Sequence, residues 1–302
     1  MAKAKLDKYY TPDDVIRVCS EALSEVVEDK MTLVIEPAAG DGRWLPHLRG
    51  AGFNNIALFD IAPDCPSVVE FDFLKGDLRP EVYGQPKVFV TNPPFGRACS
   101  LAIQFFNKAA GYEPDVIAFL IPRSFGKKLQ ARRRMHGGYI LHSITEIPKT
   151  HFERPDGVVY DGTESRVECE FQIWVKGTRA PVKVPEPVGY KILRPANKKV
   201  TDAAGVLREL PVGEIGADFT IVTHGTKAGR IEDFDPVTNK VSVRQFVKVE
   251  EGYSVEEIRK KFENTDFSYF ATASAIGAQG SINTDEIICC VEGVDFKLKS
   301  VV

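Results

Sequence analysis

The sequence predicts an α/β fold with a mostly parallel sheet, followed by a smaller C-terminal α+β domain. Short apolar runs alternate with helical stretches over residues 12–175, which is typical of parallel strands joined by crossover helices. Three of the runs end in a polar side chain, at Glu36, Asp60 and Asn92. The composition then shifts over residues 177–188, where glycine and proline mark a linker.

The composition is that of a globular protein, with 302 residues, 43% hydrophobic and 27% charged. This length suffices for one large domain or two modest ones. The formal net charge is −3, so a nucleic-acid partner would have to be met by a local basic patch. No long apolar run and no signal-peptide pattern are present, and we therefore expect a cytoplasmic protein without a membrane partner.

The cysteines and histidines indicate no metal site. The six cysteines form no C-x-x-C pair, and the five histidines are scattered. In a reducing compartment the cysteines are most simply free thiols. We predict neither a metal nor a disulfide.

The first ordered element is expected to be a helix over residues 12–27. Thr11 is a suitable N-cap, Pro12 suits the first helical position, and two acids follow in the first turn. Tyr9 and Tyr10 precede the cap. They form either a hydrophobic staple or one wall of a ligand site.

A strand over residues 32–35 leads into a loop of small residues and then a helix through Leu48. Strand, small-residue loop and helix open a nucleotide-binding βαβ unit, because small residues let a ligand approach the backbone. The loop is not G-x-G-x-x-G, and it carries acids at Glu36 and Asp41. Acids suit a cationic or amine-bearing ligand better than a pyrophosphate.

The second strand, residues 56–59, ends at Asp60, where an acid can accept both hydroxyls of a ribose. Residues 71–74 form a further acidic turn around Asp72. An adenosine with a positive group at its 5′ end would satisfy these acids. S-adenosylmethionine is such a molecule.

The third run, Val88 to Thr91, is a buried strand that must stop at Asn92, because Pro93 and Pro94 have no N–H for a sheet ladder. A polar side chain is thereby held at a strand end beside a stiff turn and the ring of Phe95. In α/β sheets, ligands bind beyond the carboxyl ends of the strands. We therefore expect the catalytic residues here.

These motifs together resemble the amino-methylating, S-adenosylmethionine-dependent methyltransferases. In that family the exocyclic-amine site reads Asn or Asp, Pro, Pro, and then Tyr, Phe or Trp; here it reads Asn92, Pro93, Pro94, Phe95. The resemblance covers residues 8–175 and implies a Rossmann-like class I methyltransferase sheet, seven-stranded and mostly parallel. The order of cofactor segment, loop, motif and extra domain is similar to the gamma arrangement of adenine-N6 DNA methyltransferases.

The resemblance implies S-adenosyl-L-methionine as the cofactor. Asp60 matches the acid that holds the ribose, and Asp72 with Phe73 matches the adenine edge. The implied cofactor-binding residues are Tyr9, Tyr10, Thr11, Pro12, Glu36, Pro37, Ala38, Gly40, Gly42, Asp60, Ile61, Asp72 and Phe73.

The resemblance also implies a mechanism without a covalent intermediate. The side-chain oxygen of Asn92 and the carbonyl of Pro93 would accept hydrogen bonds from the two N–H groups of the target amine. The proline pair would keep the turn rigid, and Phe95 would stack on the target ring. A base within a duplex would first be flipped out.

Beyond the motif, we expect a helix over residues 101–110 and strands over residues 116–121, 143–147 and 169–175. The polar segment 152–166 is either a cover for the substrate or a long hairpin connection. A basic stretch follows the strand that ends near Pro122 and resembles a segment of many amino-methyltransferases. It either meets a phosphate backbone or forms a solvated helix face. Its candidate nucleic-acid-binding residues are Arg123, Ser124, Lys127, Lys128, Arg132, Arg133 and Arg134.

The predicted domains are a catalytic domain, residues 1–178, and a target-recognition domain, residues 188–302. Within the second we expect strands over residues 219–222, 241–249 and 286–291, a helix over 255–263, and a small-residue segment over 268–281. Its basic residues serve either nucleic-acid binding or solubility. They are Lys191, Arg194, Lys198, Lys199, Lys227, Arg230, Lys240 and Arg244.

The function expected from these features is transfer of a methyl group to the exocyclic N6 amine of adenine in nucleic acid, with DNA favoured over RNA. One alternative is an RNA adenine-N6 methyltransferase. Another is a protein glutamine N5 methyltransferase, since Asn92 to Phe95 would also fit a side-chain amide. A third is a non-catalytic methyltransferase-fold protein that binds nucleic acid. The sequence indicates no oligomeric state.

Overall fold

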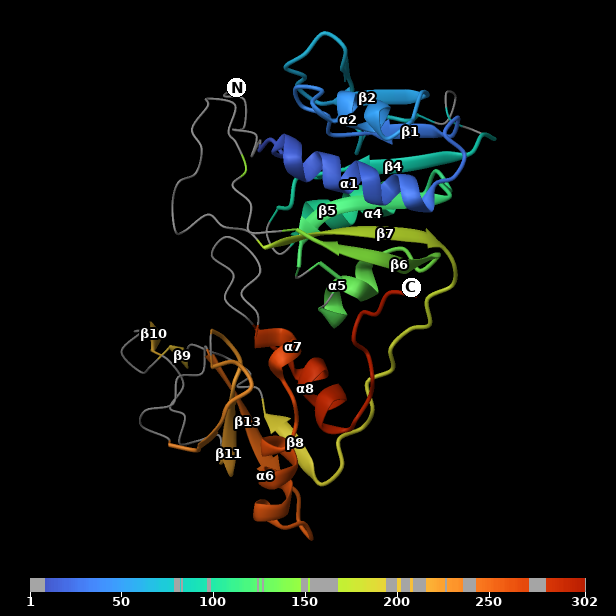
Figure 1. The fold of residues 1–302 in the computed structure, drawn as a ribbon. Coiled ribbons are helices and arrows are strands. Elements are labelled where there is room, and N and C mark those ends of the chain that lie inside the picture. Colours follow the sequence, from blue (N-terminus) through green and yellow to red (C-terminus); the bar gives the residue numbers. More distant parts are fainter. Residues whose placement is uncertain are drawn as a thin grey trace. The chain divides into compact units, whose positions relative to one another are not determined.

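The computed structural model describes residues 9–78, 82, 84–96, 99–123, 125–126, 128–147, 152, 168–193, 200–201, 207–208, 216–225, 227–235, 243–271 and 281–301. These residues form two compact units (Figure 1). The first contains the chain up to Pro181 and the tail that begins at Leu298, and the second contains most of the chain from Val182 to Lys297.

The first unit is built on one seven-stranded sheet with the order β3-β2-β1-β4-β5-β7-β6. Strand β7 pairs antiparallel with both β5 and β6, and the other pairs are parallel. The α/β Rossmann-like fold class predicted from the sequence is confirmed. The strands are β1 (Leu33–Glu36), β2 (Ile56–Asp60), β3 (Val69–Glu70), β4 (Lys87–Thr91), β5 (Val116–Pro122), β6 (Tyr139–Glu146) and β7 (Cys169–Lys176).

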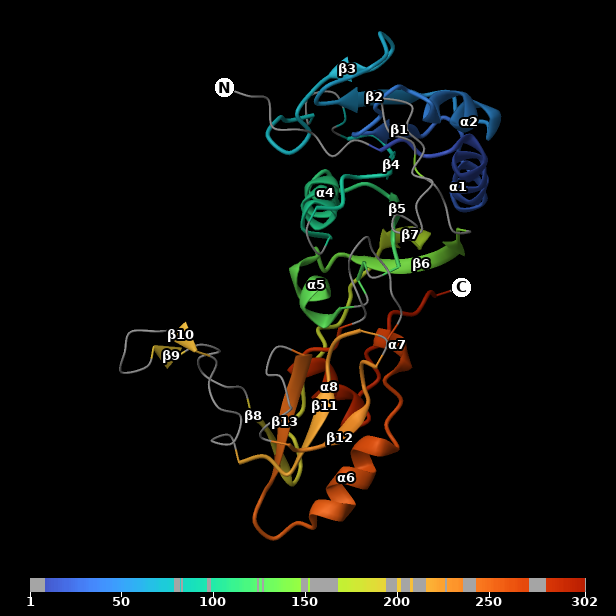
Figure 2. The same cartoon turned by 90° about the vertical axis from the view of Figure 1, so that its left-hand side faces the viewer.

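Helices cover both faces of this sheet (Figure 2). Helices α1 (Asp13–Val26) and α2 (Trp44–Gly50) pack on the face that carries Val34, Val88 and Val90. Helix α4 (Ser100–Ala110) packs on the opposite face, together with residues next to α5 (Leu129–Arg134). Because side chains alternate along a strand, the continuous apolar runs of β1, β4 and β5 supply both cores.

Helix α1 begins one residue later than expected. Its N-cap is Pro12, whose carbonyl accepts hydrogen bonds from the backbone N–H groups of Val15 and Ile16 at 3.1 and 3.0 Å. No side chain caps the helix, so the prediction that Thr11 is the N-cap is wrong. The Thr11 hydroxyl makes a different contact, described with the site below.

Two strands of this sheet also differ from the sequence-based expectation. Strand β6 begins at Tyr139 rather than at residue 143, and the short β3 was not predicted. A two-residue strand is too short to show any periodicity, and its pairing with β2 alone defines it. Of the polar segment 152–166, only Phe152 lies within the described residues.

The second unit is α+β. Its main sheet is antiparallel with the order β12-β11-β13-β8, and its core contains Tyr190, Phe219 and Phe262, whose rings pack edge to face. The elements of the unit are β8 (Tyr190–Leu193), β9 (Val200–Thr201), β10 (Leu207–Arg208), β11 (Phe219–Val222), β12 (Ile231–Asp233), β13 (Arg244–Val249), α6 (Val255–Glu263), α7 (Ser268–Ala271) and α8 (Thr284–Val291).

The strand expected over residues 286–291 is wrong, because these residues belong to helix α8. Asn283 and Glu286 form a capping box: the Asn283 side chain accepts from the Glu286 N–H, and the Glu286 side chain accepts from the Asn283 N–H, both at 2.9 Å. This cap satisfies the first free backbone donors of a helix. It outweighs the β-branched pair Ile287 and Ile288, which suggested a strand.

Two searches of the described residues had negative results. No helix among them combines the length and the apolar character needed to span a membrane. Within the same residues, no three His, Cys, Asp or Glu side chains lie close enough together to hold a metal ion.

Candidate active site

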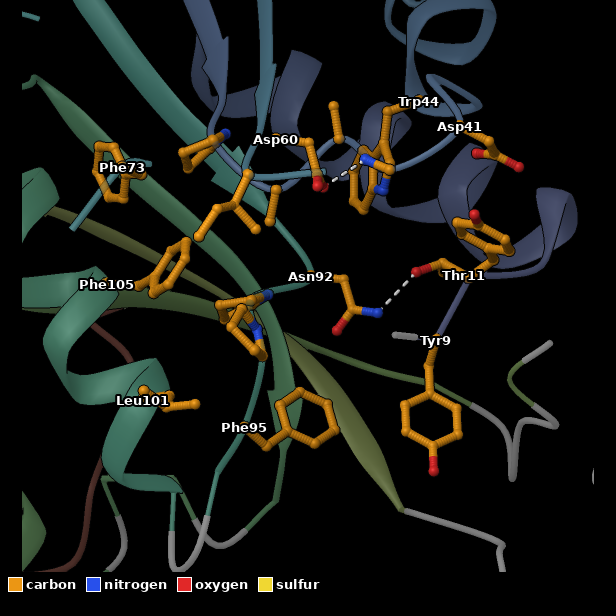
Figure 3. A pocket seen from close by; sticks show the side chains of 18 of the residues that line it. Tyr9, Thr11, Asp41, Trp44, Asp60, Phe73, Asn92, Phe95, Leu101 and Phe105 are labelled. Atoms are coloured by element: carbon orange, nitrogen blue, oxygen red, sulfur yellow. Dashed lines mark hydrogen bonds between the residues drawn. The ribbon is translucent and has the colours of Figure 1, made fainter. Parts of the chain in front are cut away.

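A cavity of about 440 Å³ lies beyond the carboxyl ends of β1, β2 and β4. The sequence placed its candidate residues on separate segments, and the fold brings most of them to this cavity. Figure 3 shows Asn92 between Asp60 and the rings of Tyr9 and Phe95. The expected residues that line the cavity are Tyr9, Tyr10, Thr11, Pro37, Ala38, Gly40, Asp60, Ile61, Asp72, Phe73, Asn92, Pro93, Pro94 and Phe95.

Three expected cofactor residues, Pro12, Glu36 and Gly42, are not among the lining residues. Pro12 is instead the cap of α1. Gly42 serves the shape of the loop, because its φ of 80° is a conformation that side chains other than glycine rarely adopt. Its neighbour Gly40 has φ 57° and does line the cavity.

Asp60 connects the end of β2 to the loop after β1. Its Oδ2 accepts a hydrogen bond from the Gly40 N–H and its Oδ1 accepts one from the Ala62 N–H, both at 2.8 Å. The side chain is thereby fixed in one orientation at the cavity wall. A carboxylate oxygen has more than one acceptor site, so Asp60 can also accept hydrogen bonds from a ligand.

Glu36 is fully buried under the cavity and does not reach it. Its Oε1 accepts from the Ala38 N–H at 2.9 Å and from the Thr91 hydroxyl at 2.5 Å, which ties the end of β1 to the end of β4. Burial raises the pKa of the Glu36 carboxyl from 4.5 to about 8. At neutral pH this side chain is therefore mostly protonated. It is an uncharged link between two strands, and the charge expected to face a cationic ligand is absent at this position.

Asp72 and the rings around it form another part of the wall. Asp72 Oδ1 accepts from the backbone N–H groups of Leu74 and Lys75 at 3.2 Å, and Oδ2 pairs with Lys75 Nζ at 2.9 Å. The hydrogen bond with Lys75 lowers the pKa of Asp72. Phe73 packs against Phe105 with ring centroids 5.2 Å apart. A carboxylate beside flat apolar surfaces suits a heteroaromatic ring with an amine edge.

Asn92 follows β4 directly, and its side-chain amide is held on one side only. Nδ2 donates a hydrogen bond to Thr11 Oγ1 at 3.0 Å. The Oδ1 atom is buried and accepts no hydrogen bond from any described residue. A buried acceptor without a donor is costly, so such an atom at a cavity wall marks a place for a ligand donor.

Aromatic rings surround the Asn92 end of the cavity. The rings of Phe95 and Phe152 pack edge to face, with centroids 6.4 Å apart and planes at 83°. Tyr9 packs in the same cluster. The carbonyl of Phe95 accepts from the N–H groups of Leu101 and Ala102 at 3.2 and 3.5 Å, which joins the turn to the start of α4.

The segment before α1 is attached to the cavity loop by Arg43. Its Nη1 donates to the Thr11 carbonyl at 3.1 Å, its Nε and Nη2 bind Asp41 at 2.9 and 2.8 Å, and its guanidinium lies 4.7 Å from the centre of the Tyr10 ring. The Tyr10 hydroxyl donates to Asp64. Burial, reinforced by this hydrogen bond, raises the pKa of Tyr10 above its usual range.

The basic stretch is less open than the sequence indicated. Arg123 forms ion pairs with Glu146 at 3.4 Å and Glu168 at 3.8 Å. The Lys128 ammonium is buried, and Arg132 is only 8% exposed. The side chains of Arg133 and Arg134 are exposed, whereas Ser124 and Lys127 lie outside the described residues.

Arg179 explains part of this burial. One of its terminal nitrogens, Nη2, donates to the carbonyls of Arg132, Met135 and His136 at 3.3, 3.1 and 3.2 Å. The segment after β7 thus covers the end of α5. Burial lowers the pKa of Arg179, and the nearby Arg132 lowers it further.

Ion pairs also occupy several basic residues of the second unit. Lys191 pairs with Glu250 at 2.9 Å, and Arg244 pairs with Glu232 at 2.6 Å. Arg230 lies 3.8 Å from Glu232. Arg194, Lys198, Lys199 and Lys240 lie outside the described residues, while Lys227 is exposed.

Several cavity residues were missed by the sequence reading. Two of them had a recognisable signal, since Phe71 and Leu74 flank Asp72 in the turn that was identified. The others come from helices and loops, where no pattern separates a cavity residue from a core residue. The missed residues are Ala39, Arg43, Trp44, Phe71, Leu74, Lys75, Leu101, Phe105 and Phe152.

Comparison with known proteins gives a remote likeness. No family model and no curated protein matches the sequence. Among solved structures, a candidate RNA methyltransferase from Pyrococcus horikoshii is 15% identical with a TM-score of 0.42, over 58% of this chain and 92% of that one. The M protein of the type I restriction enzyme EcoKI is 18% identical with a TM-score of 0.40, over 58% of this chain and 45% of that one.

A type I restriction-modification methyltransferase subunit from Streptococcus thermophilus is 13% identical with a TM-score of 0.41, over 59% of this chain and 46% of that one. The matched part is thus less than half the length of either restriction-modification subunit. Likeness at this level carries no argument about what this chain does.

The raised pKa of Glu36 predicts a stability that depends on pH. Below 4.5 the carboxyl is protonated in both the folded and the unfolded chain, and the free energy of unfolding does not change with pH from this group. Between 4.5 and about 8 only the folded chain keeps the proton, so a rise in pH lowers the free energy of unfolding. The slope is up to about 1.4 kcal/mol per pH unit.

The measurement is urea unfolding of the wild type and of Glu36→Gln across this window. Glutamine keeps an acceptor oxygen for Thr91 and Ala38 but does not titrate. We expect the stability of the wild type relative to the variant to fall as pH rises. A constant difference would mean that Glu36 is ionised in the folded protein.

Proposed function

We propose that this protein is an S-adenosylmethionine-dependent methyltransferase that modifies the exocyclic N6 amine of adenine in nucleic acid, with DNA favoured over RNA. The observation that carries the proposal is a single cavity that combines the loop after β1, Asp60 and Asp72 with the buried acceptor Oδ1 of Asn92. The loop, Asp60 and Asp72 suit an adenosine, and Asn92 Oδ1 suits the N–H donor of an amine.

The residues present fit this cofactor. About 440 Å³ lies within the usual range of small-molecule sites. Asp60 offers acceptor sites for ribose hydroxyls, and Asp72 lies beside the apolar rings of Phe71 and Phe73. Asp60 supplies a carboxylate at this wall, which suits a ligand with a sulfonium and an ammonium group.

S-adenosylmethionine, when bound, supplies an electrophilic methyl group on a sulfonium sulfur. The chain has to make a poorly nucleophilic amine reactive and to align it. Asn92 Oδ1 accepts a hydrogen bond from one N–H of the amine, and the carbonyl of Pro93 is the second acceptor in this proposal. Both interactions raise electron density on the nitrogen. Because Pro93 and Pro94 restrict the turn, little ordering is needed at the transition state.

The target ring is assigned to the aromatic end of the cavity. Phe95 and Phe152 present a face and an edge next to Asn92, which suits a planar heterocycle. A base taken from a duplex would have to be flipped to enter. The exposed Arg133 and Arg134 are candidates for contact with the phosphate backbone.

We assign target recognition to the second unit because of the order in which the cofactor loop, Asn92 and this unit follow one another along the chain. The cofactor loop and Asn92 are close in sequence, which leaves no room for a recognition domain between them. The α+β unit follows the whole sheet instead. This assignment remains part of the proposal.

Substitution of Asn92 tests the catalytic assignment. We expect Asn92→Ala to lower methyl transfer by about 10²–10³-fold, because a preorganised polar contact to the reacting group is lost. The assay follows tritiated methyl from S-adenosylmethionine into DNA, RNA and a protein extract in parallel, and mass spectrometry of digested nucleosides identifies the product.

Asn54→Ala, at an exposed position before β2, is the matched control and should keep wild-type activity. N6-methyladenine in one nucleic-acid pool would support the proposal and decide between DNA and RNA. Methylated glutamine in the protein extract would instead favour the protein-modifying alternative. Cofactor binding with no transfer to any pool would favour a non-catalytic protein.

Asp60→Ala should weaken cofactor binding by about 1–3 kcal/mol, because a charged acceptor for the ribose is lost. Isothermal titration calorimetry with S-adenosylhomocysteine measures this effect. Glu70→Ala, on the neighbouring β3 and exposed, is the control. An unchanged dissociation constant in Asp60→Ala would remove Asp60 from the cofactor site.

Charge reversal at Arg133 and Arg134 tests the nucleic-acid contact. The double variant with Glu at both positions should lower the slope of log K against log salt by roughly two, since each phosphate contact contributes about one. Fluorescence anisotropy of a labelled oligonucleotide gives this slope. Arg17→Glu, on the exposed side of α1, is the control. An unaltered slope in the double variant would mean that the basic stretch is a solvated helix face and does not contact phosphate.

A further inference from the structure

The Asn92 side chain is restrained by a residue from outside β4. Thr11 Oγ1 accepts the hydrogen bond of Asn92 Nδ2 at 3.0 Å, and Oδ1 lies on the other side of the amide, buried at the cavity wall (Figure 3). An amide has a donor end and an acceptor end. Turned the other way, it would present N–H groups to an incoming amine, whose own N–H groups could then find no acceptor there.

Thr11 is itself held rigidly. Its side chain is 2% exposed, and its carbonyl accepts from Arg43 Nη1 at 3.1 Å. The Arg43 guanidinium is fixed in turn by two contacts with Asp41 and by the ring of Tyr10. A chain of contacts therefore runs from the loop after β1, through Arg43 and Thr11, to Asn92.

The Thr11 hydroxyl does not cap helix α1. A threonine before a helix commonly accepts hydrogen bonds from the first backbone N–H groups. Here Pro12 is the cap residue and no side chain caps the helix. The hydroxyl is directed to Asn92 instead.

We propose that Thr11 is the positioning residue for Asn92 and that Arg43 holds Thr11 in place. Thr11 does not touch the reacting atoms in this scheme; it restrains the Asn92 side chain, whose Oδ1 lies at the cavity wall. The kinetic consequence rests on the proposed function, whereas the contact itself can be tested without it.

The direct test is nuclear magnetic resonance of protein labelled with [15N]asparagine. The Asn92 side-chain signal is assigned by its disappearance in Asn92→Ala. In the wild type its amide protons should exchange slowly with solvent. Thr11→Val, which keeps the shape but removes the acceptor, should shift this signal and accelerate the exchange by about tenfold. Thr11→Ser keeps the hydroxyl and should restore both.

The kinetic test compares the same variants in the methyl-transfer assay. Thr11→Val should lower kcat by about ten- to hundredfold, with KM for the nucleic acid changed by less than about threefold. Thr11→Ser should recover most of kcat. Arg43→Lys should act in the same direction as Thr11→Val but more weakly, because lysine cannot form the paired contact with Asp41.

Thr32→Val, at the opposite end of β1, controls for the general effect of the substitution on a buried threonine. An unchanged Asn92 signal in Thr11→Val, or a kcat within about twofold of the wild type, would overturn the proposal. A wild type that transfers no methyl group would contradict the proposed function, while the Asn92 signal would still decide the role of Thr11.

Discussion

The site depends on one backbone constraint, the absence of N–H groups at Pro93 and Pro94. Strand β4 lies in the middle of the sheet and would otherwise continue its ladder with β1 and β5. Because it ends at Thr91, the next residue leaves the sheet at its carboxyl edge. There Asn92 meets the loop after β1 and the segment before α1, and the cavity forms between them.

Two polar contacts, one buried and one partly buried, hold the pieces around that edge. Glu36 joins the ends of β1 and β4 through Thr91, and its burial favours the uncharged form, which a hydrogen-bonded link between strands can tolerate. Thr11 joins the segment before α1 to Asn92. The first contact fixes where the Asn92 backbone lies, and the second restrains its side chain. Both act through hydrogen bonds of uncharged groups.

The charge of the cavity follows from which acids reach it. Glu36 does not, whereas Asp41, Asp60 and Asp72 do. Asp41 forms an ion pair with Arg43, and Asp72 forms one with Lys75, each within its own turn. The acids thus shape their own loops and leave carboxylate oxygens at the wall. The same division holds for the basic stretch, where Arg132 is buried beside Arg179 whereas Arg133 and Arg134 are exposed.

The sequence by itself determined the α/β sheet, the polar residues at the carboxyl ends of β1, β2 and β4 and most of the lining residues, because apolar runs, glycine and proline act on the local backbone. It misread Thr11 as a cap and residues 286–291 as a strand, it did not anticipate the burial of Glu36, and it did not separate buried from exposed members of the basic stretch. Only the tertiary structure decided these points. Burial, pKa and the partner of a hydroxyl depend on residues such as Thr91, Asn92 and Arg179, which are distant in sequence and adjacent only after folding.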